Sequence, residues 1–165
     1  MTAARQKRKR GAGLALTVIV AAALSLFAAA ARASLTARVV VDWHTGLAID
    51  GYDPVAFFTD GAALPGTSAF ELSHAGVVWR FRNIGNRAAF AERPDIYMPR
   101  YGGYDPVAVA RGVAVAGKPN VWIIVGQRLF LFYDPAERQK FIGDPLHVIA
   151  TADRKWPQVA RALGP

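Results

Sequence analysis

The hexapeptide Gly-Tyr-Asp-Pro-Val-Ala occurs twice in this chain of 165 residues, at Gly51–Ala56 and at Gly103–Ala108. A shift of 51 residues also aligns Phe81 with Phe132, Arg87 with Arg138, Phe90 with Phe141 and Pro94 with Pro145. The repetition predicts an internal ββα pseudo-repeat, with half-units at 51–102 and 103–153 and pseudo-twofold packing. The alternative is that any hairpin followed by a helix places aromatic residues at similar intervals.

The first half predicts a β-hairpin followed by a helix. Apolar residues alternate in Phe70–Ser73 and again in Val77–Phe81, on either side of a three-residue turn at His74–Gly76. Asn83 is a residue type that caps helices, and we expect a helix from there until Pro94 ends it.

The second half predicts the same order of elements. The apolar runs Val121–Val125 and Arg128–Tyr133 flank a two-residue hairpin loop with Gly at its first position. Asp134 begins a helix with Pro at its first turn, Asp144 begins another, and Pro157 is expected to open a short last helix. The predicted fold is therefore α+β, an antiparallel sheet from two β-hairpins with packed helices.

Residues 1–33 have the order of a secretory signal peptide. A basic run at Arg5–Arg10 precedes an uncharged, Ala-rich stretch at Gly11–Ala31, and small residues follow at the positions that a signal peptidase recognises. We expect export to the periplasm with cleavage after Ala33. The competing interpretation is an uncleaved membrane anchor, because the apolar run approaches the roughly 20 residues that span a bilayer.

The composition of residues 34–165 differs from that of the whole chain. Six of the 20 Lys and Arg residues lie in residues 1–33, whereas all 12 Asp and Glu residues follow, so the net charge of residues 34–165 is only +2. This balance argues against a nucleic-acid partner, which needs a basic surface on the folded domain. The length predicts a single domain. The chain contains no cysteine, which excludes disulfides, thiolate metal ligands and thiol nucleophiles.

Three motifs stand close together in the first half and at its end. They are Tyr-Asp-Pro-Val-Ala at Tyr52–Ala56, Trp-Arg-Phe at Trp79–Phe81 and Tyr-Gly-Gly-Tyr at Tyr101–Tyr104. In this combination the chain resembles the exported YHS-domain family of bacteria. The resemblance covers residues 49–104 and extends more loosely to the C-terminus.

The resemblance implies a fold but not the chemistry of the family. Small YHS modules look like heavy-metal binders, and their cysteine positions correspond here to Ala56, Arg82 and Asn86, none of which is a soft metal ligand. Exported relatives often carry Cys after Tyr-Gly-Gly-Tyr, where this chain has Asp105. The chain is therefore a cysteine-free variant of the pattern, and Asp105 is where it departs from it.

The repeated Tyr-Asp pair gives the candidate ligand-binding site. Tyrosine hydroxyls and two carboxylates suit a hard cation or a small polar molecule, and the candidate residues are Tyr52, Asp53, Tyr101, Tyr104 and Asp105. The alternative is structural, because an Asp before Pro caps a helix or starts a turn, and the chain uses Asp-Pro four times. The tyrosines would then be core residues whose hydroxyls reach the backbone.

Two histidines, His44 and His74, are weaker metal candidates, and solvated side chains are the alternative. No nucleophile elbow or phosphate loop is present in the sequence.

We therefore expect a non-enzymatic binding module, with a small polar ligand or a divalent metal ion as its ligand. The other interpretations are a protein-interaction or structural module of an envelope complex, and an uncharacterised enzyme. Membrane contact is expected only through the N-terminal segment, if it is uncleaved.

Overall fold

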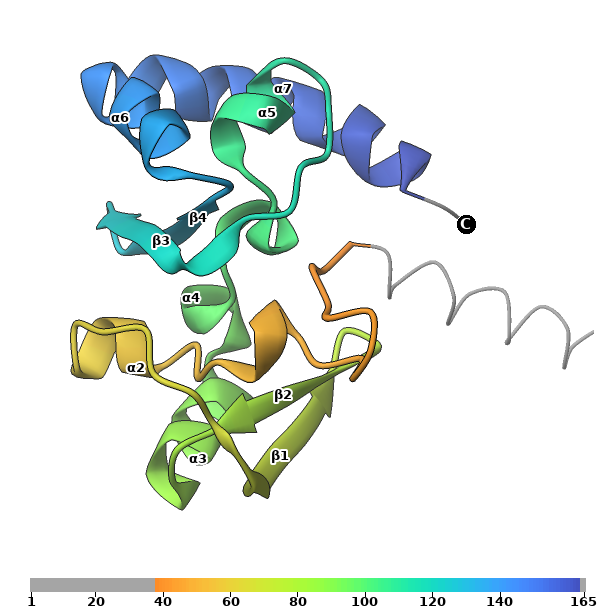
Figure 1. Ribbon diagram of the computed structural model, residues 1–165, viewed down its shortest axis with the longest axis vertical. Coiled ribbons are helices and arrows are strands. Elements are labelled where there is room, and N and C mark those ends of the chain that lie inside the picture. Colours follow the sequence, from red (N-terminus) through yellow and green to blue (C-terminus); the bar gives the residue numbers. More distant parts are fainter. Residues whose placement is uncertain (1–37, 164–165) are drawn as a thin grey trace, which may run out of the picture.

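The computed structural model describes residues 38–163 (Figure 1), so the signal-peptide prediction lies outside the described residues. Two antiparallel hairpins are formed by β1 (Thr67–His74) with β2 (Val77–Phe81) and by β3 (Lys118–Val125) with β4 (Arg128–Phe132). The helical elements are η1 (Ile49–Gly51), α2 (Ala56–Thr59), α3 (Ile84–Glu92), α4 (Pro94–Tyr97), η2 (Arg100–Gly103), α5 (Pro106–Ala110), α6 (Pro135–Gly143) and α7 (Pro145–Ala162). The α+β class is confirmed, with the hairpins as two separate two-stranded sheets instead of one sheet.

The elements of the second half follow those of the first in the same order. Figure 1 shows β1, β2, α2 and α3 together at the bottom and β3, β4, α5, α6 and α7 at the top. The strands β3 and β4 and helix α6 each begin 51 residues after β1, β2 and α3. Both hairpins have a register irregularity at the same place, between Thr67 and Glu71 and between Lys118 and Trp122. A duplication of one unit stays a prediction.

Both hairpin loops have two residues. In the second hairpin these are Gly126 and Gln127, as predicted, with φ of 56° and 59°. The predicted three-residue loop of the first hairpin is wrong, because His74 pairs with Val77 and so belongs to β1. Its loop, Ala75 and Gly76, has φ of 53° and 80°, the left-handed geometry of a tight hairpin turn.

The predicted helix caps are present. The side-chain oxygen of Asn83 accepts a hydrogen bond from the Asn86 amide at 2.8 Å, and Asp134 and Asp144 cap α6 and α7 in the same way. The separate last helix expected at Pro157 is wrong, because α7 continues through this residue. A proline lacks the N–H for one helical hydrogen bond, but Val159 beyond it is buried and continues the apolar face of α7.

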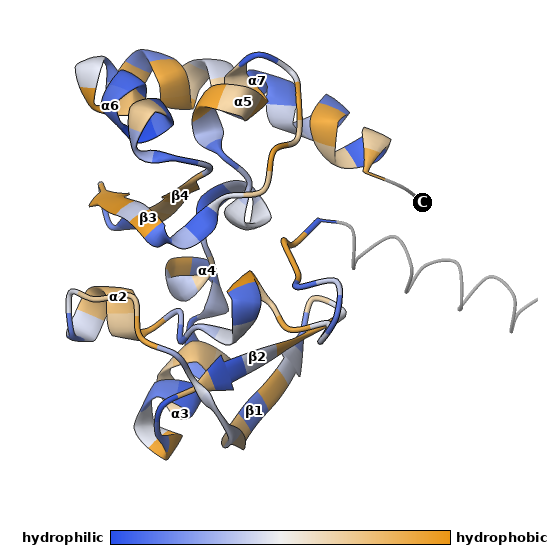
Figure 2. Cartoon of the chain, viewed as in Figure 1, coloured by the Kyte–Doolittle hydropathy of each residue, from blue (hydrophilic) through white to orange (hydrophobic). Residues whose placement is uncertain are grey.

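The core consists of two aromatic clusters joined by β4. In the first, Trp79 and Phe81 pack on Phe90, and in the second, Phe130 and Phe132 pack on Phe141, with ring centroids 5.0 and 5.2 Å apart in each case. The alternate β4 residues, Leu129 and Leu131, belong to the first cluster. Strand β4 is therefore buried on both faces, and Figure 2 shows it in apolar colours, while β2 carries a hydrophilic interruption.

The segment before η1 connects the two halves. The Val40 amide donates to the carbonyl of Gly102 at 2.8 Å, while Leu47 forms a parallel bridge with Val78 of β2. Gly102 has φ of +62°, and a Cβ atom there would lie 1.7 Å from the carbonyl oxygen of Arg38. Only glycine allows this close approach of the two backbones. Among residues 38–163, no helix combines the length and apolar composition needed to cross a bilayer.

Candidate functional site

The aspartate of the first hexapeptide is fully buried and ties a helix to a strand. Asp53 Oδ1 accepts hydrogen bonds from the amides of Val55 at 2.8 Å and Ala56 at 3.4 Å, at the start of α2. Its Oδ2 accepts from the Arg82 amide at 2.8 Å, directly after β2. The side chain of Asn86 donates to the same oxygen at 2.7 Å. Four donors thus surround this carboxylate, which fixes α2 against the hairpin.

The aspartate of the second hexapeptide makes the corresponding backbone contacts. Asp105 is also fully buried, and its Oδ1 accepts from the amides of Val107 at 2.8 Å and Ala108 at 3.1 Å, at the start of α5. Its Oδ2 accepts from the Tyr133 amide at 2.9 Å, directly after β4. Both aspartates therefore have a structural role of the kind predicted, with Asp105 as the cap of α5 and Asp53 in the turn that leads into α2.

The fourth donor is where the two aspartates differ. The residue at the position of Asn86 in the second half is Glu137, whose carboxylate accepts from Lys140 Nζ at 2.9 Å and pairs with Arg111 Nη1 at 3.3 Å. Burial raises the pKa of Asp105, three backbone N–H groups oppose that rise, and the charge of Glu137 adds to it. Asp105 is thus the less well compensated carboxylate of the two.

The five predicted ligand-binding residues are divided between the two halves of the structure. The contacts of Asp53 and Asp105 stay within their own halves. Tyr52 packs against the first core cluster, while Tyr101 and Tyr104 belong with the second. The structure therefore brings the last two tyrosines together and separates them from the first Tyr-Asp pair.

The aromatic partner that joins Tyr101 and Tyr104 is Trp156 of α7. Its ring centroid lies 5.7 Å from that of Tyr101 and 6.0 Å from that of Tyr104. The Tyr101 hydroxyl donates to Asp153 Oδ1 at 2.9 Å, and this carboxylate also pairs with Arg100. Burial raises the pKa of both tyrosines, with the hydrogen bond to Asp153 as a further cause for Tyr101. Both hydroxyls therefore keep their protons near neutral pH.

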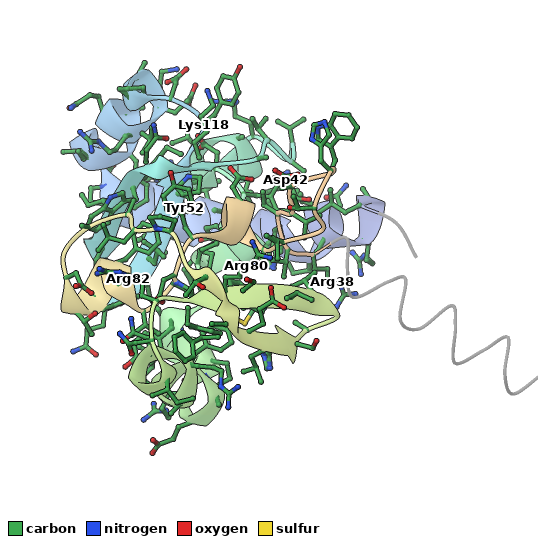
Figure 3. The ribbon with its side chains drawn as sticks, turned by 60° about the horizontal axis from the view of Figure 1, so that its bottom comes forward. Arg38, Asp42, Tyr52, Arg80, Arg82 and Lys118 are labelled. Carbon is green, nitrogen blue, oxygen red and sulfur yellow. The ribbon has the colours of Figure 1, made fainter. Side chains whose placement is uncertain are left out.

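A depression of about 390 Å³ opens beside Trp156. It is lined by Arg38, Trp156, Pro157, Ala160 and Arg161. Figure 3 shows Arg38 extending from the start of the described chain beside α7. Neither arginine takes part in an ion pair within residues 38–163.

Sequence analysis did not single out this depression, because a tryptophan such as Trp156 is expected in a core. The spacing of Trp156, Ala160 and Arg161 places them near one another on one helix face, and this pattern is a signal that the sequence does contain. Arg38 carries no such signal, because its position depends on the contact of its backbone with Gly102.

The two candidate histidines lie in different surroundings. His44 is exposed in a turn that Asp42 holds by accepting from the His44 amide at 2.7 Å, and its ring centroid is 3.3 Å from that of Trp43. His74 is half-buried, with its ring edge-on to Phe90 at 5.7 Å. Among residues 38–163, no three His, Asp or Glu side chains form a group suited to a metal ion.

The geometry therefore offers two kinds of location, the enclosed aspartate caps and the open depression beside Trp156. The caps have their oxygens engaged by the backbone, whereas the depression exposes two arginines next to an aromatic face. Comparison of the chain with family models, curated proteins and solved structures found no match.

Proposed function

We propose that this protein is a non-enzymatic, exported binding module for a small polar ligand, and that the ligand binds in the depression beside Trp156. The observation that carries this proposal is the meeting of Trp156 with Arg38 and Arg161, which have no ion pair within residues 38–163, in a concave part of the surface. Concave sites with an aromatic wall and a few polar groups are the usual places for small ligands. Export rests on the sequence of residues 1–33.

A divalent metal ion as the ligand has less support than a small polar molecule. The aspartates of the two hexapeptides, Asp53 and Asp105, direct their oxygens to backbone N–H groups. A metal ion at either carboxylate would have to replace these bonds, which hold α2 and α5 to the hairpins. The YHS-type resemblance stays a prediction from the motifs.

Thermal melting with small-molecule panels tests the proposal, because a ligand that binds only the folded state raises the melting temperature. We expect polar compounds, and not divalent ions, to give the shift. The shift is expected to be lost in Trp156→Phe, which keeps an aromatic ring but changes its shape, and kept in the control Trp43→Ala. Trp43 suits this control because its side chain is 84% exposed and lies outside the depression.

A divalent ion that raises the melting temperature of the wild type but not of Asp53→Asn would overturn this choice in favour of a metal site. Polar ligands that stabilise the wild type and Trp156→Phe equally would contradict the location.

A second candidate function is a protein-interaction module of the cell envelope, which the exposed apolar side chains favour. Trp43 and Leu146 are 84% and 77% exposed. An envelope partner that covers either residue would be lost on Trp43→Ser or Leu146→Ser, while binding of small ligands would remain. Co-purification of crosslinked envelope proteins with each variant measures this.

A further inference from the structure

We infer that the ligand of the depression is an anion, with a phosphate or carboxylate group bound between Arg38 and Arg161 and a flat apolar portion against Trp156. The inference rests on the proposed function, because it concerns the same site and specifies the chemical class of its ligand. Arginine presents a planar set of donors that matches carboxylate and phosphate oxygens, often with two parallel hydrogen bonds.

The charges around the depression support an anion. Two other arginines are paired with carboxylates, since Arg100 pairs with Asp153 and Arg111 with Glu137. Within residues 38–163, Arg38 and Arg161 have no carboxylate partner, and no acidic residue lines the depression. The one acidic side chain on the adjacent turn of α7, Asp153, is held by Arg100 and the Tyr101 hydroxyl. Among the residues that the structure describes, the depression therefore presents two positive charges without a carboxylate partner.

The backbone places Arg38 at this site from far away in the sequence. The carbonyl oxygen of Arg38 lies against the Cα of Gly102, where any Cβ would come within 1.7 Å, and the Val40 amide bonds to the Gly102 carbonyl. The corresponding residue of the first half is Asp50, which has a side chain at nearly the same φ, 55°. The close approach is thus a feature of the second half alone, and it brings a cation to the face of α7.

The aromatic wall of the depression is held by neighbouring rings. Tyr101 and Tyr104 pack on Trp156, and Pro157 directly follows it in α7. A ring that is held in place loses little conformational freedom when a ligand stacks on it. Arg161 also lies in the last turn of α7, where a positive charge stabilises the helix C-terminus. This stabilisation does not explain why Arg38 lies beside it.

The experiment uses the purified full chain, with phenyl phosphate as the probe and benzyl alcohol as a neutral compound of similar ring size. Isothermal titration is expected to give a Kd on the order of 1 mM for phenyl phosphate, because the site is open. Added salt is expected to weaken this binding, because salt screens exposed charges. Benzyl alcohol is expected to bind at least about tenfold more weakly.

The variants Arg38→Gln and Arg161→Gln are each expected to weaken phenyl phosphate binding by about three- to tenfold. The matched control is Arg154→Gln, since Arg154 is an exposed α7 arginine that bonds to Thr151 and does not line the depression. Circular dichroism melting confirms that each variant folds. Equal weakening by all three substitutions would show a general charge effect and overturn the inference.

Two further results separate this inference from the proposed function. Benzyl alcohol that binds as tightly as phenyl phosphate, and depends on Trp156, would overturn the anion and leave the binding module intact. A panel in which no compound binds would overturn both.

The same anionic group occurs in free metabolites and in lipid headgroups, and vesicles separate these sources. Co-sedimentation compares vesicles of phosphatidylglycerol with vesicles of phosphatidylcholine, for the wild type and the double variant Arg38→Gln/Arg161→Gln. Because residues 1–37 are the same in both proteins, a difference between them reports only the two arginines. Loss of phosphatidylglycerol binding in the double variant supports a headgroup, and an unchanged result with weakened phenyl phosphate binding supports a free anion.

Discussion

The two halves of this molecule have the same order of elements but use their hairpins differently. Strand β2 buries one face, and its other face carries the half-buried Val78 and Arg80. Strand β4 buries both faces, because Leu129 and Leu131 enter the core of the first half while Phe130 and Phe132 form their own. The comparison teaches that one local unit serves as a surface element or a central one, depending on what packs against its second face.

The aspartate caps show the same principle at a smaller scale. Identical hexapeptides give identical backbone contacts, but the environment supplies Asn86 as a fourth donor in one half and the acidic Glu137 in the other. Local sequence sets the cap, and the neighbouring helix sets how well the buried charge is compensated.

The largest expected effect on stability comes from placing the residue of one strand at the equivalent position of the other, for Leu131 of β4 and Arg80 of β2. Leu131→Arg buries a charge in the first core, and we expect it to lower the free energy of unfolding by more than about 4 kcal/mol. Arg80→Leu removes only a partly exposed pair with Glu71, with an expected effect within about 1 kcal/mol. Urea denaturation followed by circular dichroism measures both. Similar losses in the two variants would show that β2 and β4 are equivalent in burial.

The next effect distinguishes the two caps. In Asp53→Asn, the amide group opposes two donors in either orientation, and we expect a loss of about 3 kcal/mol. In Asp105→Asn, the amide can face the single N–H of Tyr133, and we expect about 2 kcal/mol. Thermal melting of both variants at neutral pH gives the comparison. A larger loss for Asp105→Asn would contradict the role given to Asn86.

A third substitution gives the second half the residue of the first. We expect Glu137→Asn by itself to change the free energy of unfolding by less than about 1 kcal/mol, because a new donor to Asp105 offsets lost exposed pairs with Arg111 and Lys140. In this background Asp105→Asn is expected to cost about 1 kcal/mol more than in the wild type. A double-mutant cycle measures this coupling, and additivity of the two substitutions would rule out the predicted contact.

The smallest effect is a pH dependence that belongs to Asp105. Because burial raises its pKa in the folded state above the ordinary value of 3.8, the folded state holds this proton more tightly than the unfolded chain. Its contribution to stability is therefore greatest below pH 3.8 and is lost as the pH rises through the raised pKa. We expect the destabilisation by Asp105→Asn to be larger at acidic than at neutral pH. Denaturation of both proteins across that range tests the sign, and a difference that grows with pH would contradict it.

The local structure was largely predictable from the sequence. Alternating apolar and polar residues predicted the two hairpins. Three helix starts were predicted from capping residue types, at Asn83, Asp134 and Asp144. Both patterns are local, because caps and strands depend on neighbouring residues. Pro157 misled the prediction, because the packing of α7 outweighs one missing hydrogen bond. The first hairpin loop differed by one residue, since an Ala at positive φ is not apparent from its residue type.

The candidate site was predictable only in part. The capping interpretation of Asp53 and Asp105 follows from Asp-Pro and agrees with the observed bonds. The meeting of Arg38 with Arg161 was not predictable, because it depends on a long-range backbone contact at Gly102 that no local pattern encodes.

The position of β4 in both cores also determines how the protein unfolds. If either core opens, β4 loses the packing on one of its faces, so neither half keeps a complete interior without the other. We therefore expect a single cooperative transition, in which the amide hydrogens of β4 exchange with solvent only when the whole domain unfolds. A protease that removes one half would leave the other with an incomplete core. Although the order of elements is repeated, we therefore expect neither half to fold alone.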